Sequence, residues 1–456
     1  MIIDISYITE NKNLVRKRGR IIIKEIELSY GIEKKYLYIN DNNLAGFLKP
    51  IIPAKTYKPS EAFEIALDNP INRQRLEDLS KNKKVCVTIE DYTRSEPHRE
   101  IVLSLSKRLT KADFVQYIIV TGTHNPRDER NLRIKSLIQN IAKDIGLKFD
   151  VAINDSRADD EFEYVGTTKS GTKVLANKKA LDAELFVTAS DMKPHYFAGY
   201  SAANKHFLPG MCAFETTRVN HCGLIKNEKS NYGRHPWHYD KERQENPLSA
   251  DMIEAMSLIA KDRPIFTLAL ISDGDVLWSQ SGPIEDVTKN GIKSADEVFS
   301  FRVEPVPYLI VSPGGSPEDN YLYSGQRALE LTSEAVDQDG EVLWLSKCSL
   351  GIHTGKDQQE IDDFYNAMMK NLDALTDELD QPDVKFHTYK AYRFKRLLKK
   401  IRVYGYSKLD DSVMKNIGIE PINDPQKVVE MWLSNDPLAK ILVVDKANKL
   451  AIYKSN

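Results

Sequence analysis

The chain has 456 residues, too many for one ordinary hydrophobic core, and this length predicts about two or three domains. Its 41% hydrophobic and 29% charged residues are typical of a soluble globular protein. The formal net charge is −2, from 64 basic and 66 acidic residues, so no broad basic field for nucleic acid or for an anionic membrane is expected.

The sequence predicts neither membrane insertion nor secretion. No stretch approaches roughly eighteen uninterrupted apolar residues, the length of a membrane-spanning helix. The first residues lack a basic segment followed by an apolar one, and Asp4 interrupts their only short apolar run, so no signal peptide is expected. Widely spread cysteines without a C-x-x-C pair predict neither a disulfide framework nor a zinc knuckle. They are Cys86, Cys212, Cys222 and Cys348. We therefore predict a cytoplasmic protein.

From about residue 84, short β-rich runs alternate with longer amphipathic runs. Helices are expected after Pro97 and over about fifteen residues after Pro126, at helical spacing of Leu and Ile. Strands are expected at 85–91, 114–124, 149–155 and 184–191. This alternation favours a mostly parallel sheet covered by helices on both faces.

A second α/β stretch begins near residue 264. Strands are expected within 265–275, 308–317, 341–349 and 440–453, with helices at 324–336 and 357–372. We predict an α/β fold of two domains with mostly parallel sheets and an active-site cleft between them. The N-terminal domain would span residues 1–263 and the C-terminal domain residues 264–437, with about 438–456 as a candidate addition to the first domain.

Polar side chains follow three strands of the first predicted sheet. Asp91 and Arg94 follow the first strand, His124 follows the second, and His195 follows the strand that ends at Asp191. The carboxyl ends of parallel strands share one edge of the sheet, where loops converge, so these side chains are expected to lie together. Histidine suits general acid–base catalysis because its ordinary pKa is about 6.5.

Each of these residues also has a structural explanation. Asp91 can be a helix N-cap and Arg94 a surface cation. A single histidine after a strand is more often a loop residue with its hydrogen bonds satisfied than a catalyst. Two histidines at equivalent strand ends weigh against that explanation.

The segment 194–224 combines His195, Lys205, His206 and His221 with several glycine and alanine residues. Small residues let a backbone approach a phosphate or a planar ligand closely. A buried lysine beside such a loop can become a nucleophile or a covalent attachment point, although a structural lysine is the commoner case. The pattern G-x-G-x-x-G is absent, so no dinucleotide-binding fold is predicted.

Several ordered motifs make the sequence resemble the nickel-pincer lactate racemase family. The family's D-x-T-R is matched by residues 91–94, its G-T-H by 122–124, and its P-H-x-x-A-G-[FY]-S-small-small-x-K by 194–205. Its L-P-G and N-H follow as residues 208–210 and 220–221. Residues 313–319 look like its second-domain G-G-x-P-x-D, and the resemblance extends from about residue 26 to beyond residue 350.

The resemblance implies a nickel-pincer nucleotide, a nickel-bearing pyridinium-3,5-bisthiocarboxylic acid mononucleotide, bound covalently to Lys205 as a thioamide. His221 would be the remaining nickel ligand, because a neutral imidazole beside soft sulfur donors suits square-planar Ni(II). Loading would depend on cofactor biosynthesis proteins as partners. The other residues that the resemblance implies in cofactor contact are Asp91, Thr93, Tyr200, Ser201 and Ala202.

The resemblance also implies a racemase or epimerase that inverts C2 of a small-molecule 2-hydroxy acid. His124 and His195 would stand on opposite sides of C2, and one would take the hydroxyl proton while hydride leaves C2. Return of hydride to the other face of the planar 2-keto acid, with a proton from the second histidine, would invert the centre. Arg94 would bind the substrate, whose carboxylate suits an arginine fork. The N-terminal domain would thus bind cofactor and catalyse, and the C-terminal domain would bind substrate and close.

Two departures from the family pattern bear on the substrate. Ala202 and Ala203 replace two glycines of the lactate enzymes, which crowds the loop only slightly. Ser324 and Arg327 stand where lactate-type members carry Gln and Lys, and an arginine fork is not equivalent to a lysine point charge. We therefore expect Ser324 and Arg327 to bind a longer or more polar acid, such as an aldonate or a hydroxy-diacid.

Other interpretations stay open from the sequence. The chain can be a lactate racemase proper, or a non-catalytic homologue that binds cofactor or ligand. A zinc hydrolase using His124, His195 and His221 is disfavoured, because no carboxylate or cysteine ligand motif lies nearby. Residues 225–247 are expected to form a long loop, in which His235 and His238 are interpreted as exposed polar residues.

Overall fold

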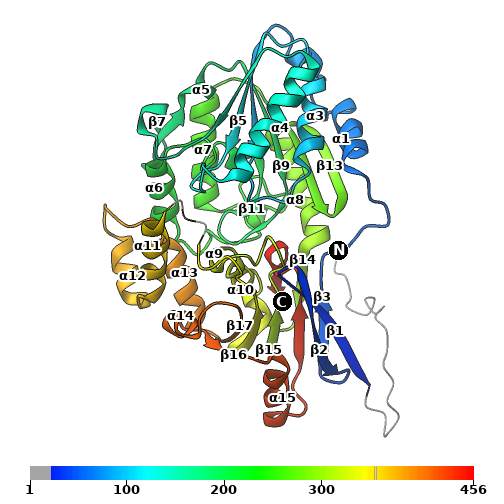
Figure 1. The fold of residues 1–456 in the computed structure, drawn as a ribbon, viewed down its shortest axis with the longest axis vertical. Helices are drawn as coiled ribbons and strands as arrows, with labels where there is room; N and C mark the ends of the chain where they lie inside the picture. The colour runs from blue at the N-terminus through cyan, green and yellow to red at the C-terminus, as the bar shows by residue number, and fades with distance from the viewer. Residues whose placement is uncertain (1–21, 354, 356, 456) are drawn as a thin grey trace. The chain divides into compact units, whose positions relative to one another are not determined.

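The computed structural model describes residues 22–353, 355 and 357–455. The described residues divide into two compact units (Figure 1): unit 2 runs from Ile52 to Val298, and unit 1 combines residues 22–51 with the described residues from Phe299. Each unit is built around a six-stranded sheet. The predicted α/β fold with mostly parallel sheets is confirmed, whereas the predicted cleft between the domains stays a prediction.

The sheet of unit 2 is parallel except at one edge, where β13 pairs antiparallel with β12. The strand order is β13-β12-β9-β4-β5-β6. In chain order the strands are β4 (Lys84–Glu90), β5 (Phe114–Val120), β6 (Phe149–Ile153), β9 (Leu185–Asp191), β12 (Ile265–Asp273) and β13 (Asp275–Pro283). The four strands expected between residues 85 and 191 are therefore confirmed.

Alternate residues of these strands serve the two faces of the sheet, as the strand period requires. Val85, Val87 and Ile89 of β4 belong to a buried cluster with Ile101 of α3 and Ile138 of α4. Figure 1 shows the helices of that face beside one another. They are α1 (Pro59–Asp68), α3 (His98–Lys107) and α4 (Glu129–Ile145). The short helix α2 (Leu76–Leu79) lies between α1 and β4 in the chain.

The opposite layer of unit 2 carries the segment that the sequence singles out. Its helix α7 begins with Pro247 after an Asn246 cap and contacts both η3 and the β7–β8 hairpin. The elements are η2 (Asp159–Glu161), β7 (Phe162–Thr167), β8 (Lys173–Asn177), α5 (Lys178–Leu181), β10 (Lys193–His195), β11 (Gly199–Ser201), η3 (Ala203–His206), α6 (Phe214–Leu224), η4 (Lys241–Arg243) and α7 (Pro247–Ala260). Helix α8 (Ile284–Phe299) follows β13.

The sheet of unit 1 is wholly parallel, in the order β18-β17-β16-β15-β19-β3. The strands are β3 (Leu44–Leu48), β15 (Val306–Val311), β16 (Val336–Leu345), β17 (Arg402–Tyr406), β18 (Glu420–Pro421) and β19 (Ile441–Val444). A hairpin of β1 (Ile23–Tyr30) and β2 (Glu33–Asn40) joins the same core through Leu28 and Leu37, and β14 (Ser300–Val303) pairs with β20 (Ala451–Lys454).

The helices of unit 1 include a departure from the sequence prediction. The helix expected at 324–336 is broken into α9 (Leu322–Gly325), α10 (Arg327–Leu331) and η5 (Ser333–Ala335). Gly325 weakens the helix, and its carbonyl oxygen accepts a hydrogen bond from Trp344 Nε1 at 3.2 Å. The remaining elements are α11 (Gln358–Met369), α12 (Leu372–Leu379), α13 (Thr388–Leu398), α14 (Asp411–Ile417), α15 (Pro425–Asn435) and η6 (Ala447–Lys449).

The predicted boundary between residues 263 and 264 is wrong. Strand β12 pairs with β9, with Ile265 opposite Phe186, so the chain stays in unit 2 until Val298. The assignment of residues 438–456 to the first domain is also wrong, because β19 pairs with β3 in the sheet of unit 1. An apolar run such as 265–275 suits either sheet, and local sequence does not decide which sheet receives it.

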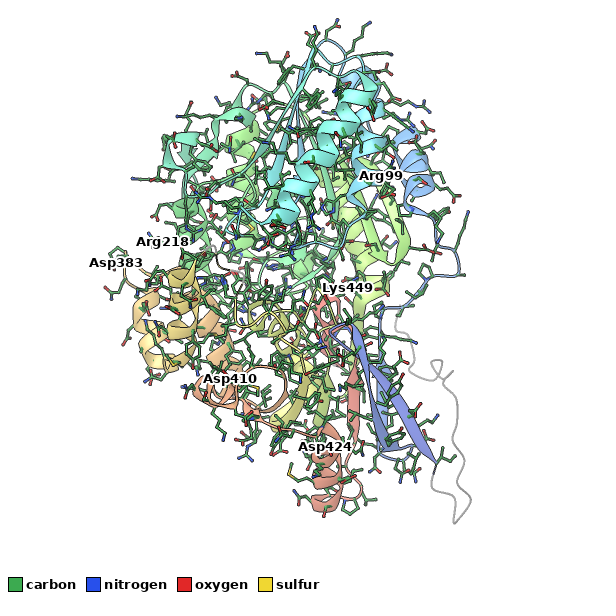
Figure 2. The ribbon with its side chains drawn as sticks, in the orientation of Figure 1. Arg99, Arg218, Asp383, Asp410, Asp424 and Lys449 are labelled. Carbon is green, nitrogen blue, oxygen red and sulfur yellow. The ribbon has the colours of Figure 1, made fainter. Side chains whose placement is uncertain are left out.

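Side chains fill the space between the sheet and the helices within each unit, and exposed charged residues such as Arg99 of α3 lie at the surface (Figure 2). All four cysteines are buried and free. In the described part of the chain, no helix is long and apolar enough to cross a membrane.

Candidate active site

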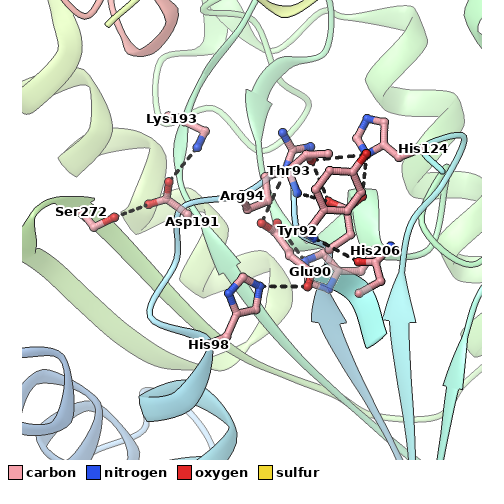
Figure 3. A network of polar contacts seen from close by, with 12 residues as sticks. Glu90, Tyr92, Thr93, Arg94, His98, His124, Asp191, Lys193, His206 and Ser272 are labelled. Atoms are coloured by element: carbon pink, nitrogen blue, oxygen red, sulfur yellow. Dashed lines mark hydrogen bonds and ion pairs between the residues drawn. The ribbon is translucent and has the colours of Figure 1, made fainter. Parts of the chain in front are cut away.

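The loops after β4 and β5 bring Thr93 and His124 together at the carboxyl end of the unit 2 sheet (Figure 3), and Asp91 contacts both. His124 Nδ1 lies 2.7 Å from Asp91 Oδ2. Thr93 donates its hydroxyl to Asp91 Oδ1 at 2.7 Å, and its backbone N–H donates to the same oxygen at 3.2 Å. The expected convergence of Asp91 and His124 from two strand ends is therefore confirmed.

The Asp91 carboxylate determines which nitrogen of His124 carries a proton. Burial alone would raise the pKa of Asp91, which is 2% exposed, but the nearby His124 and Arg94 outweigh that effect and lower it. Because an ionised carboxylate only accepts hydrogen bonds, His124 Nδ1 must donate to it. In the neutral ring, Nε2 then carries the lone pair, as a general base requires.

Glu90, the last residue of β4, links Arg94 to the segment that carries Lys205. Arg94 Nε lies 3.7 Å from one oxygen of Glu90, and His206 Nε2 lies 3.2 Å from the other. His206 Nδ1 lies 2.8 Å from Thr88 Oγ1. Because His206 ends η3 directly after Lys205, these contacts hold the lysine segment against β4. Sequence reasoning assigned no role to Glu90 or His206, and no local pattern could have paired them.

A second buried carboxyl, Glu96, lies beside Glu90. Burial and then the negative charge of Glu90 raise the pKa of Glu96 well above its usual value. For Glu90, burial would raise the pKa, but hydrogen bonds from Glu96 and His206 and the charge of Arg94 outweigh it and lower the pKa. Glu96 is thus the protonated donor and Glu90 the carboxylate.

Replacement of Glu96 with glutamine is expected to change the pH dependence of stability. Because the folded pKa of Glu96 is raised, its stabilising contribution is complete below about pH 4.3, the unfolded value, and is lost as pH rises through the folded pKa. Glutamine donates a similar hydrogen bond without a proton to lose. The free energy of unfolding of the wild type should therefore fall relative to Glu96→Gln by up to about 1.4 kcal/mol per pH unit in that interval.

Urea unfolding of both proteins from about pH 5 to about pH 9 measures this difference. Glu163→Gln, at an exposed position of β7, is the matched control and should leave the profile unchanged. Parallel profiles for the wild type and Glu96→Gln would contradict the assignment of the proton to Glu96.

The ring of Phe197 gathers three further residues that the sequence singles out. The ring centroids of His195 and His221 lie 4.5 Å and 5.0 Å from the centroid of Phe197, and Lys205 Nζ lies 5.7 Å from it. The three residues come from β10, α6 and η3 respectively. His221 is buried, whereas His195 and Lys205 are partly exposed. Three elements of unit 2 therefore converge on one aromatic ring.

The two predicted catalytic histidines differ in their hydrogen bonding. His195 Nδ1 accepts a hydrogen bond from the backbone N–H of Ala198 at 3.2 Å. The proton of its neutral ring therefore lies on Nε2, the opposite of the arrangement at His124. The ring of His195 also stacks on Tyr196, with centroids 5.0 Å apart.

The surroundings of Lys205 and His221 are compatible with the implied cofactor. Lys205 is partly exposed and follows Asn204, whose buried Oδ1 has no hydrogen-bond partner among the described residues. His221 Nδ1 lies 3.0 Å from Asn220 Oδ1, so its orientation is held from one side. The implied cofactor needs an amine for its covalent tether and an oriented imidazole as a nickel ligand, and both groups lie beside the ring of Phe197.

Two glycines of the segment 194–224 lie where other parts of the protein's own backbone approach closely. Gly199 has φ +78°, and a Cβ there would lie 1.7 Å from the carbonyl oxygen of Arg234. At Gly210, a Cβ would lie 2.3 Å from the carbonyl oxygen of His206. Close approach between chain segments therefore explains these two glycines without a ligand.

Tyr200, Ser201 and Ala202, expected to contact the cofactor, are all buried. The hydroxyl of Tyr200 donates to Asp296 Oδ1 at 2.6 Å and accepts from Arg243 at 3.1 Å. Both bonds are internal to unit 2. Cofactor contacts of these residues, and those of Asp91 and Thr93, stay predictions.

The segment 225–247 is a loop as predicted, but the exposure predicted for its histidines is wrong. His235 and His238 are both 0% exposed, and burial lowers the pKa of His235 to about 3. The loop packs on the β10–β11 hairpin, where Asn246 Nδ2 donates to the carbonyl oxygen of Phe197 at 2.9 Å. Internal hydrogen bonds let this polar segment be buried without a hydrophobic period.

The residues expected to select the substrate lie in unit 1, whereas the other predicted site residues lie in unit 2. The Ser324 hydroxyl donates to the carbonyl oxygen of Tyr321 at 3.1 Å. Arg327 Nε donates to the carbonyl oxygen of Ser324 at 3.1 Å. Both side chains are partly exposed.

A zinc site receives no support. Among residues 22–353, 355 and 357–455, no group of three or more His, Cys, Asp or Glu side chains is arranged to hold a metal ion. His124, His195 and His221 therefore do not form the three-ligand set that a catalytic zinc requires.

Unit 2 has an α/β fold, with two histidines, an ionised aspartate and an amine at the carboxyl end of its sheet. This combination is typical of α/β enzymes. Residues 30–233 match the lactate racemase N-terminal domain. The lactate racemase of Thermoanaerobacterium thermosaccharolyticum is 29% identical over 342 residues, which cover 73% of this chain and 76% of that protein. The lactate racemase of Lactiplantibacillus plantarum is 26% identical over 436 residues, covering 92% and 97%.

Two solved structures share the fold. The lactate racemase apoprotein from Thermoanaerobacterium thermosaccharolyticum has a TM-score of 0.81 at 24% identity, covering 94% of this chain and 100% of that chain. A protein from Thermotoga maritima has a TM-score of 0.66 at 14% identity, covering 90% and 100%. The chain is therefore similar to lactate racemases over most of its length, and it is an isomerase of the racemase type.

Proposed function

We propose that the chain inverts C2 of a 2-hydroxy acid, as a racemase or, for acids with further stereocentres, as an epimerase. The observation that carries the proposal is the grouping of His195, Lys205 and His221 around Phe197. The paired Asp91 and His124 supply a second base in the same unit. We further propose that the enzyme works in the cytoplasm.

The proposed cofactor is the nickel-pincer nucleotide, held by Lys205 as a thioamide and by His221 as a nickel ligand. When bound, this group accepts a hydride from C2 and returns it. The partly exposed Lys205 amine and the oriented His221 imidazole support this role. Thr93, Ser201 and Ala202 are proposed cofactor contacts, and the biosynthesis proteins of the cofactor are proposed partners.

The proton steps are assigned to the two histidines. His124 Nε2 takes the hydroxyl proton of one enantiomer, and the buried Asp91 carboxylate stabilises the imidazolium that forms. Loss of that proton, with loss of hydride from C2, leaves a planar 2-keto acid. His195, first protonated from solvent, returns a proton from Nε2 to the carbonyl oxygen as hydride is restored on the other face, and its ring ends neutral. The histidines exchange roles for the opposite enantiomer, after proton exchange with solvent.

Arg94 is proposed to bind the substrate carboxylate. Burial would lower the pKa of the Arg94 guanidinium, but the negative charges of Glu90 and Asp91 outweigh desolvation and raise it. A permanently charged, oriented guanidinium can bind a carboxylate through two parallel hydrogen bonds.

Ser324 and Arg327 are proposed to select an acid longer or more polar than lactate. We expect an aldonate or a hydroxy-diacid to be turned over at least about tenfold faster than lactate, corresponding to about 1.4 kcal/mol of preference. Reaction of each pure stereoisomer, followed by chiral chromatography, measures this with enzyme co-expressed with the cofactor-making proteins. The double variant Ser324→Gln, Arg327→Lys should shift preference toward lactate. Turnover of lactate as fast as of every longer acid would favour the alternative, a lactate racemase proper.

A further inference from the structure

His221 is the first member of a buried chain of polar contacts that continues into α7. His221 Nδ1 lies 3.0 Å from Asn220 Oδ1. Asn220 Nδ2 donates to Asp251 Oδ2 at 2.7 Å. The two oxygens of Asp251 also accept hydrogen bonds from the hydroxyls of Thr168 and Thr172, at 2.5 Å and 2.8 Å. The chain therefore connects α6, α7 and the loop between β7 and β8.

Only one assignment of donors and acceptors is consistent with this series of hydrogen bonds. A carboxylate accepts hydrogen bonds and donates none, so the group of Asn220 that faces Asp251 must be its NH₂. The carbonyl oxygen of Asn220 then faces His221, and His221 Nδ1 must carry a proton to donate to it. The lone pair of the neutral imidazole consequently lies on Nε2, the atom that a metal ion binds.

Because these hydrogen-bonded residues are buried, a change in the orientation of the Asn220 amide is costly. Asp251 is 2% exposed and Asn220 is 0% exposed, so water does not compete for their hydrogen bonds. If the amide of Asn220 turned over, its oxygen would face the Asp251 carboxylate and its NH₂ would face His221. Two buried acceptors would then face each other, and the hydrogen bond between Asn220 and Asp251 would be lost.

We propose that Asn220 is a positioning residue for the metal ligand. Asn220, held by Asp251, keeps the His221 ring in the tautomer that presents an unprotonated Nε2. The inference rests on the proposed function, because it takes His221 as the nickel ligand. Partners of this kind orient metal-binding histidines, and their loss typically weakens metal binding about 10–100-fold.

The tautomer itself can be measured in the full chain without cofactor. In long-range proton–nitrogen spectra of protein labelled at its 9 histidines, the His221→Gln variant identifies the signals of His221. The wild type should show a protonated Nδ1 and an unprotonated Nε2. Asn220→Ala should shift His221 toward protonation of Nε2, and Asp251→Asn should mix the two forms, because a neutral amide no longer dictates the orientation of Asn220.

The loaded enzyme provides the second measurement. Intact-protein mass measures the adduct on Lys205, and metal analysis during dialysis against a chelator measures how fast nickel is lost per adduct. Asn220→Ala should keep the adduct but lose nickel about 10–100-fold faster than the wild type. Asn177→Ala is the matched control, because Asn177 is also buried and donates to Asn154 Oδ1 at 3.0 Å. It should lower stability and leave nickel release unchanged.

The outcomes separate this inference from the proposed function. An adduct in both proteins, with equal nickel release and an unchanged His221 tautomer, overturns the positioning role alone. A wild type without adduct, despite proven cofactor supply, overturns the proposed function and the inference that rests on it. Faster nickel release and a shifted tautomer in Asn220→Ala, with neither change in Asn177→Ala, support the role.

Discussion

Replacement of Lys205 with alanine is expected to abolish both the cofactor adduct and turnover. A thioamide requires the ε-amine, which alanine lacks, and the proposed cofactor would supply hydride chemistry that side chains do not provide. Intact-protein mass spectrometry of protein co-expressed with the cofactor-making proteins should show a nucleotide-sized adduct on the wild type only. Turnover of the variant should fall to the level of buffer.

Lys205→Arg is the control that separates the covalent bond from the charge. Arginine keeps a cation near the ring of Phe197, where Lys205 Nζ lies 5.7 Å from the centroid. It should nevertheless carry no adduct and show no turnover, since the covalent bond and not the charge is required. An adduct that persists in Lys205→Ala would place the tether at another residue. Absence of an adduct from the wild type as well would favour the non-catalytic binding homologue.

Replacement of either proposed catalytic histidine, His124 or His195, is expected to suppress racemisation while leaving the oxidation half-reaction for one enantiomer. General acid–base catalysis by a side chain contributes about 10²–10⁴-fold to rate, so steady-state interconversion should fall by that range in both variants. His124→Ala should still oxidise the enantiomer that His195 deprotonates, and His195→Ala should oxidise only the other. A single turnover with each pure enantiomer, quenched and assayed for the 2-keto acid, measures the two half-reactions.

Each histidine variant serves as the control for the other, because the two should select opposite enantiomers. If both variants oxidised the same enantiomer, a single histidine would serve both faces of C2 and the assignment of opposite sides would be wrong. If both variants racemised at the wild-type rate, neither histidine would move the hydroxyl proton. The hydrogen bond between Asp91 and His124 would then have a structural role only.

Much of unit 2 follows from local sequence patterns. The strands expected near Val85, Phe114, Phe149 and Leu185 are present within a few residues of their predicted bounds. Strand and helix periods are local properties, since each reports which side of an element is buried. The adjacency of Asp91 and His124 followed from the rule that parallel strands present their carboxyl ends at one edge.

The domain boundaries were decided by pairing between distant segments. Strand β3 lies in the unit 1 sheet beside β19, with Leu442 opposite Gly46. Strand β12 extends the unit 2 sheet instead of starting a new one. An apolar strand carries no local signal for the sheet that it joins, because edges of both sheets offer similar backbone hydrogen bonds.

The sequence alone determined the α/β class and most strands, since these depend on residue type and local period, whereas the reactive residues that it suggests stay predictions. Only the tertiary structure decided what surrounds them. It paired Glu90 with His206, buried His238 within a polar loop, and held Asn220 with Asp251. Such contacts join residues far apart in the chain, and the free energy of burying polar groups depends on partners that no local pattern specifies.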